Sequence, residues 1–142
     1  MPVEVREFAE STATAEAAAA AVGITPARIV KSLVFATPDG QPLLALVSGA
    51  NRVDLAKLSA IVGQHVGRAD PERVRQVTGF AIGGVPPVGH ASPLPVFVDR
   101  DLLELDLVWA AAGTPNTVFS IEPTRLVEVT RGQVVDLKLN PG

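Results

Sequence analysis

The chain has no cysteine, which excludes disulfides, cysteine nucleophiles and thiolate metal sites and leaves the redox compartment open. Histidine is almost as scarce, since only His65 and His90 occur, and a structural zinc site is therefore not expected. Long apolar runs are also missing, and no segment approaches the roughly 20 residues that a membrane-spanning helix needs. The N-terminus lacks the basic-then-apolar order of a signal peptide. These absences together predict a cytoplasmic protein.

Basic residues are too few for a large nonspecific nucleic-acid surface, because the net charge is −3 and such surfaces need many Lys and Arg contacts to phosphates. This balance does not exclude a small pocket that holds only the end of an RNA. Hydrophobic residues make up 47% of the chain and charged residues 19%, which argues against disorder. A length of 142 residues predicts one domain, spanning 1–142, with a real core.

Periodicity and turn residues predict a mixed α/β domain. The order is a helix, a hairpin around the turn at 38–40, two helices, and then strands separated by short helical segments. Strand succession is too irregular for a doubly wound parallel sheet, and no Gly-rich phosphate loop opens a helix. The predicted helices are 14–22, 54–62, 71–78, 102–105, and 124–127 or a little beyond. One predicted strand follows the turn at Thr25-Pro26 and ends at 36, and the others cover 43–48, 96–98, 107–111, 117–121 and 134–137.

The strand that follows the turn at Thr25-Pro26 is apolar on both faces except for Lys31, which lies on the same face as Ile29 and Leu33. An ammonium there must reach solvent, find a partner or lose its proton. Two roles are open at this point. The first is structural, because a lysine at the edge of an apolar strand protects it against aggregation. The second is functional, because a lysine in a cleft suits an anion, an ester carbonyl or an amino-acid group.

Two loops are candidates for ligand contact. In residues 83–89, free N–H groups of Gly83, Gly84 and Val85 would meet a ligand oxygen, while the two prolines stiffen the loop; the plain alternative is a sharp connection into the next strand. In residues 113–116, Asn116 either closes an Asx turn or presents its amide to a ligand.

Classical catalytic patterns are missing from the remaining polar residues. No Ser–His–Asp or paired-carboxylate arrangement can be argued from spacing. His90 is a candidate general base, but a hydrogen bond to the backbone near Ser92 explains it equally well. His65 is expected to begin a strand. The acidic residues of 99–106 are expected to form a solvated turn in which Asp99 or Asp101 caps the short helix.

Four stretches in this order and spacing resemble the YbaK family, the free-standing form of the editing domain inserted in bacterial prolyl-tRNA synthetase. The stretches are residues 28–35, 54–58, 83–89, and 113–116 followed by a strand and Pro123. The resemblance covers roughly residues 14–135, nearly the whole predicted domain.

The resemblance implies a strongly curved, mostly antiparallel sheet surrounded by helices, and a trans-editing aminoacyl-tRNA deacylase that needs no cofactor and no metal. Lys31 matches the family's pocket lysine. Gly83 and Pro87 match a Gly-x-x-x-Pro loop that holds the terminal adenosine and the aminoacyl group, and Gly113 and Asn116 fall on a second pocket loop. The implied partners are the aminoacylated 3′ end of a tRNA, commonly tRNA for proline, and an aminoacyl-tRNA synthetase.

One departure from the family leaves the edited amino acid open, with Ala, Cys, Ser and Thr as candidates. Some members carry a histidine in or just after the second loop, and this chain has none between Asn116 and Phe119. Two other functions stay open as well. One is a noncatalytic module that binds aminoacyl-tRNA or a small ligand, and the other is an interaction domain that accompanies a synthetase.

Overall fold

The computed structural model of the chain describes residues 4–9, 11–12, 14–82, 84–114 and 116–140. Eight strands, four α-helices and two 3-10 helices lie in this part of the chain. Their order is β1 (Val5–Glu7), α1 (Ala15–Val22), η1 (Pro26–Arg28), β2 (Ile29–Ala36), β3 (Pro42–Ser48), α2 (Leu55–Val62), β4 (Gly67–Arg68), α3 (Pro71–Thr78), β5 (Val96–Asp99), η2 (Arg100–Glu104), β6 (Val108–Ala111), β7 (Thr117–Ile121), α4 (Pro123–Thr130) and β8 (Gln133–Val135). None of the helices described is long and apolar enough to span a membrane.

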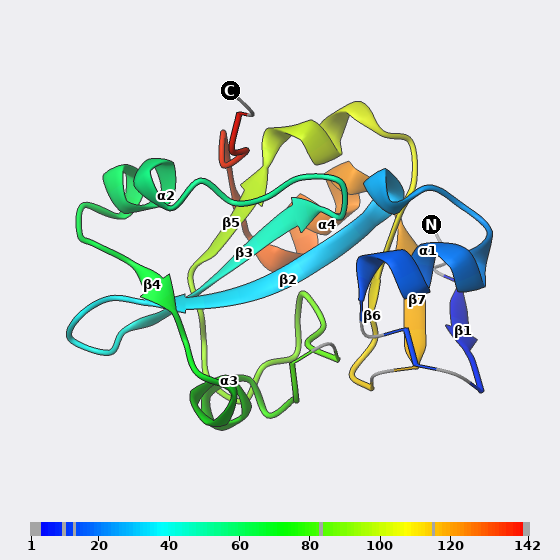
Figure 1. Cartoon of the computed structure of the whole chain (residues 1–142), viewed down its shortest axis with the longest axis horizontal. Helices are drawn as coiled ribbons and strands as arrows, with labels where there is room; N and C mark the ends of the chain where they lie inside the picture. The colour runs from blue at the N-terminus through cyan, green and yellow to red at the C-terminus, as the bar shows by residue number, and fades with distance from the viewer. Residues whose placement is uncertain (1–3, 10, 13, 83, 115, 141–142) are drawn as a thin grey trace.

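All eight strands belong to one mixed sheet with the order β1-β7-β6-β2-β3-β5-β8, and β4 pairs with β2 outside this path. Four pairings are antiparallel: β1–β7, β6–β7, β2–β3 and β2–β4. Three are parallel: β2–β6, β3–β5 and β5–β8. The predicted mixed α+β class with a mainly antiparallel sheet is thus confirmed. In Figure 1 the long strand β2 crosses the centre of the molecule.

Local capping signals set the ends of the first three α-helices, and these helices begin and end within one residue of their predicted bounds. Each starts behind a side chain that accepts a hydrogen bond from a free N–H of the first turn. Each ends at a glycine in the left-handed conformation, which costs glycine little because it has no Cβ. The caps are Thr14 and Gly23 for α1, Asp54 and Gly63 for α2, and Asp70 and Gly79 for α3.

The two faces of β2 pack differently. Val30 and Val34 face a large apolar cluster that includes residues of α3 and α4. The opposite face is covered in two separate parts, because α1 packs near Ile29 and α2 packs near Phe35. Figure 1 shows these two helices over opposite ends of β2. Lys31 lies on this second face between the two covered parts, so the helices leave room above its side chain.

Three predictions differ from the structure in detail. Strand β1 was not predicted, because its three exposed residues carry two charges and show no apolar alternation. The helix predicted at 124–127 or a little beyond is α4, which continues to Thr130. The expected strand at His65 begins two residues later, at Gly67, and is only two residues long.

A fourth prediction was wrong, since Asp99 does not lie in a solvated turn. Its side chain is fully buried at the end of β5. One carboxylate oxygen accepts a hydrogen bond from the backbone N–H of Leu137 at 2.9 Å. Asp99 occupies the N-cap position of η2, but its side chain makes no capping hydrogen bond to this helix. The carboxylate binds groups in the protein interior instead.

Candidate functional site

A cavity of about 490 Å³ lies where β2 and β6 separate. The two strands pair only at Ile29 with Trp109 and at Val30 with Ala110. The same edge of β2 is next paired at Phe35, by β4. The middle of β2 therefore has an open edge toward the cavity in this part of the structure. A volume of this size suits a small organic group such as a nucleoside carrying an amino acid.

Lys31 is half-buried and lines this cavity. Its ammonium donates a hydrogen bond to the backbone oxygen of Asn51. Burial lowers the pKa of Lys31 below its usual value, Glu16 opposes this by its negative charge, and Arg52 and Arg68 lower the pKa further. The side chain thus carries a donor that meets the cavity and holds its proton less firmly than a lysine in water. Of the two roles left open by the sequence, the structure places Lys31 in a cleft.

A loop that sequence reasoning passed over, residues 49–52, forms one wall of the cavity beside Lys31. Gly49 has no room for a side chain, because a Cβ would lie 2.4 Å from the backbone oxygen of Pro26 and 2.7 Å from the Cβ of Ala15. The composition of this loop is that of an ordinary turn. The register of the hairpin could have indicated this loop. Val47 pairs with Lys31, so the residues that directly follow β3 lie close to the lysine.

Two acidic residues, the buried Asp99 and the partly exposed Asp101, hold this loop in position. The Asn51 amide donates to a carboxylate oxygen of Asp101 at 2.9 Å and lies 3.4 Å from one of Asp99. Burial raises the pKa of Asp99, the hydrogen bond from the Leu137 N–H lowers it, and the nearby Asp101 raises it. A chain of contacts therefore runs from a buried carboxyl group through Asn51 to the ammonium of Lys31.

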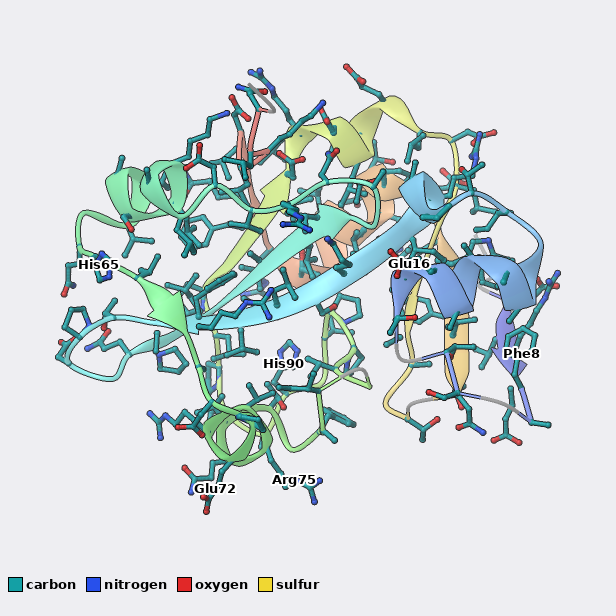
Figure 2. All side chains as sticks on the ribbon, viewed as in Figure 1. Phe8, Glu16, His65, Glu72, Arg75 and His90 are labelled. Atoms are coloured by element: carbon teal, nitrogen blue, oxygen red, sulfur yellow. The ribbon has the colours of Figure 1, made fainter. Side chains whose placement is uncertain are left out.

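Glu16 is a second cavity residue that sequence reasoning did not select. It occupies the first turn of α1, where an acidic residue is favoured by the helix dipole for purely local reasons. Figure 2 shows it at the end of α1 that faces the middle of β2. Its charge reaches Lys31 through space, as the effect on the lysine pKa indicates.

The first candidate loop contributes in part to this cavity. Val85 lines it, together with Ile82. Gly83 lies outside the described residues. Gly84 is buried and its N–H donates to the backbone oxygen of Ala81 at 2.9 Å, so the expectation of a free N–H at Gly84 was wrong.

The end of the same loop lies on a different hollow. Pro87 is buried and lines a cavity of about 220 Å³ together with His90. The His90 ring forms a 2.7 Å hydrogen bond through Nε2 to the backbone oxygen of Pro86, and neither residue lines the cavity of Lys31. Figure 2 shows His90 on the loop that follows α3. The partner is Pro86 and not the backbone near Ser92.

The second candidate loop is fastened to other segments. The Asn116 amide donates to the backbone oxygen of Phe8 at 2.7 Å, and its own oxygen accepts from the Thr114 hydroxyl at 2.9 Å. Gly113 has a φ of 105°, and a Cβ there would lie 3.1 Å from the ring of Phe80. The described lining of the Lys31 cavity includes neither Gly113 nor Asn116. Their role in ligand contact stays a prediction.

A small side pocket adjoins the main cavity. It holds about 50 Å³ and shares Ser32, Leu33, Ile82 and Val85 with it. The Ser32 hydroxyl is buried and has no hydrogen-bond partner in the described part of the protein. An unpaired buried hydroxyl is costly, so it marks a place where a polar group of a ligand would be favourable.

The described residues contain no group of three or more His, Asp or Glu side chains that would hold a metal ion. The described lining of the cavity carries the ammonium of Lys31, the guanidinium of Arg52, the carboxylate of Glu16, the hydroxyls of Thr12, Thr14 and Ser32, and backbone groups at the open edge of β2. Such a set can orient a polar ligand and stabilise negative charge that develops on it.

Comparison with known proteins gives a consistent result. The sequence profile of the aminoacyl-tRNA editing domain family matches residues 9–129. A crystal structure of a protein proposed to be a trans-editing enzyme for prolyl-tRNA synthetase is 52% identical, with a TM-score of 0.91 over 97% of this chain and 87% of that one. YwhH of Bacillus subtilis is 34% identical over 92% of this chain and 83% of its own. EbsC of Enterococcus faecalis, named as a proposed Cys-tRNA(Pro)/Cys-tRNA(Cys) deacylase, is 26% identical over 96% of this chain and 85% of its own.

Proposed function

The chain belongs to the aminoacyl-tRNA editing domain family, and we propose that it is a deacylase that hydrolyses the ester between a wrong amino acid and a tRNA. One observation carries the proposal beyond family membership. The half-buried ammonium of Lys31 lines a cavity large enough for a terminal aminoacyl-adenosine, at the one place where the middle of β2 is open. A lysine that only protects a strand edge against aggregation would not need to be half-buried beside a cavity.

In the proposed reaction a water molecule attacks the ester carbonyl carbon, and the bond to the ribose oxygen breaks to release the amino acid and a tRNA with a free hydroxyl. Lys31 would contact the carbonyl oxygen or the ribose and stabilise the negative charge that develops there. Asn51 fixes the lysine through its backbone oxygen. The described cavity presents only Glu16 as a carboxylate, so we assign most of the rate to orientation of the water and exclusion of bulk solvent.

For the substrate we propose a tRNA for proline that carries a small side chain such as Ala, Cys, Ser or Thr. Support comes from the prolyl-tRNA synthetase and Cys-tRNA(Pro) named for two relatives. The side pocket of about 50 Å³ beside Ser32 also favours a small group. Pocket size alone separates one methylene by only about 1–3 kcal/mol. The reaction belongs to translation, and we place it in the cytoplasm, with a synthetase as the partner that supplies the substrate.

The test is deacylation of a panel of mischarged tRNAs carrying alanyl, cysteinyl, seryl and threonyl esters on tRNA for proline and on their own tRNAs. We expect release of at least one amino acid by the wild-type protein and its loss in Lys31→Met. A folded wild-type protein that binds these tRNAs and releases nothing would instead be a noncatalytic binding module. A protein that binds none of them but copurifies with a synthetase would be an interaction domain.

A further inference from the structure

A second hollow opens on the other side of Lys31 and holds about 430 Å³. It shares Lys31, Leu33 and Arg52 with the cavity described above, so the two hollows meet at the lysine. We call the second one the arginine groove. Its lining residues are Lys31, Leu33, Phe35, Arg52, Val53, Leu55, Arg68 and Leu139.

The arginine groove is positively charged in a protein whose net charge is −3. Arg52 and Arg68 are both exposed, and its described lining contains no acidic residue. No ion pair or side-chain hydrogen bond within the described part of the chain includes either guanidinium. Both arginines also act on Lys31, whose pKa they lower by repulsion. Like charges held together without a counter-charge favour an anionic occupant.

Apolar surface lies next to these charges. The side chains of Leu55 and Leu139 are 40% and 46% exposed, although both are large and apolar. The wall they form is fixed, because the Leu139 N–H donates to the backbone oxygen of Arg52 at 2.8 Å and Val53 forms a β-bridge with Lys138. Apolar side chains beside guanidinium groups suit a nucleotide, whose base is apolar on its faces and whose phosphate pairs with arginine. An inorganic anion would make no favourable contact with the two leucines.

We propose that the arginine groove binds the phosphodiester-linked nucleotides that precede the terminal aminoacyl-adenosine of the RNA substrate. This inference rests on the proposed function. The ester lies in the cavity at Lys31, and the strand leaves it through the groove, where Arg52 and Arg68 meet phosphates and the leucines meet a base. RNA contact is thereby confined to the last few nucleotides, which fits a chain with few basic residues.

The groove can be tested by binding alone, without turnover. The probe is a fluorescein-labelled RNA hairpin that ends in single-stranded CCA, compared with the same hairpin without CCA, and affinity is measured by fluorescence anisotropy between 50 and 200 mM salt. The variants are Arg52→Gln, Arg68→Gln and the double variant. Arg75→Gln is the matched control, because Arg75 is exposed on α3 and points away from the sheet (Figure 2).

We expect the wild-type protein to prefer the hairpin with CCA. Each phosphate contact to a single strand contributes about 0.7 to the slope of log affinity against log salt, so the double variant should show a slope shallower by about 1.4. With equal affinities at 1 M salt as the reference, the same relation predicts that its affinity at 100 mM salt falls by about 25-fold. Arg75→Gln should match the wild type, and the thermal midpoints of all four variants should stay unchanged because the substituted side chains are exposed.

Four results would overturn the proposal: no binding by the wild type at low salt, no preference for CCA, double-variant binding equal to wild type, or an equal loss in Arg75→Gln. Hydrolysis of an aminoacyl ester of adenosine, which has no phosphate, gives a second check, since the double variant should lose less of its kcat/KM on this ester than on the same ester carried by the hairpin. If the hairpin results are as expected but no ester is hydrolysed, the groove stands and the deacylase function fails. If esters are hydrolysed and the arginines do not matter for the hairpin, the reverse holds.

Discussion

Replacing Lys31 with Met separates the catalytic proposal from a structural role of this lysine. Methionine keeps the length and flexibility of the side chain but has no charge. The change removes one hydrogen bond from a charged donor to the Asn51 backbone oxygen. It also removes a half-buried ammonium that burial and two arginines disfavour, as the lowered pKa of Lys31 shows.

These two effects on stability oppose each other. A hydrogen bond from a charged group contributes about 1.5–3 kcal/mol, while a lowered lysine pKa means that the folded protein holds the ammonium less well than water does. We therefore expect the free energy of unfolding of Lys31→Met at pH 7 to lie within about 1 kcal/mol of wild type, or above it. Activity should respond quite differently, because losing one stabilising donor at a reacting ester costs about 10²- to 10³-fold in rate.

The pH dependence has a definite sign. Between the lowered pKa of Lys31 in the folded protein and its usual value of 10.5, the unfolded chain binds a proton that the folded protein does not. Wild-type stability should therefore rise relative to Lys31→Met as pH increases through that window. The deficit that Lys31 causes is fully present below its folded pKa and disappears above 10.5.

The measurements are guanidinium unfolding at pH 7 and pH 10 and kcat/KM for the best ester of the panel. Lys57→Met is the matched control, because Lys57 is a half-buried lysine with a structural ion pair to Asp136 at 3.1 Å. The Lys57→Met variant should be less stable than wild type and keep the wild-type kcat/KM. The reasoning fails if Lys31→Met loses more than about 2 kcal/mol of stability, or if its kcat/KM stays within threefold of wild type.

Three further substitutions test the surroundings of the site. Gly49→Ala should cost about 1–3 kcal/mol of unfolding free energy, because its Cβ would overlap the Pro26 backbone oxygen; Gly67→Ala, where a Cβ meets nothing within 4 Å, should cost much less in the same assay. Ser32→Ala should leave stability unchanged or raise it by up to about 1 kcal/mol, and a clear loss in urea unfolding would mean that the hydroxyl has a partner. Asp99→Asn should gain stability relative to wild type as pH rises from 3.8 to the raised pKa of Asp99, because the folded wild type holds a proton there that the unfolded chain releases; urea midpoints from pH 3 to 7 that move the other way would contradict this.

The secondary structure was largely predictable because its signals are local. N-cap side chains, terminal glycines and the alternation of apolar residues act within a few positions of the chain. They gave the helices that begin after Thr14, Asp54 and Asp70, and the hairpin of β2 and β3. The same alternation identified Lys31 as a charged residue on an apolar face. This observation needs only neighbouring residues, and it pointed to the candidate site.

The surroundings of Lys31 were decided by tertiary structure. The cavity exists because β6 leaves β2 after Val30, and nothing in either strand's own sequence states where their pairing stops. Asp99 looked like a member of an acidic surface turn, and only the packing of β5 against β8 buries it and turns it toward Asn51. The arginines of the groove come from two separate segments whose approach depends on the whole sheet.

The sequence by itself thus determined the first three α-helices, the hairpin of β2 and β3, and the position of Lys31 on an otherwise apolar face of β2, because each depends on neighbours along the chain. Tertiary structure alone decided that the Asn116 amide binds the backbone oxygen of Phe8 and that the backbone of loop 49–52 accepts the hydrogen bond from Lys31. These contacts depend on how distant segments are brought together, and the free energies that bring them together are spread over the whole core.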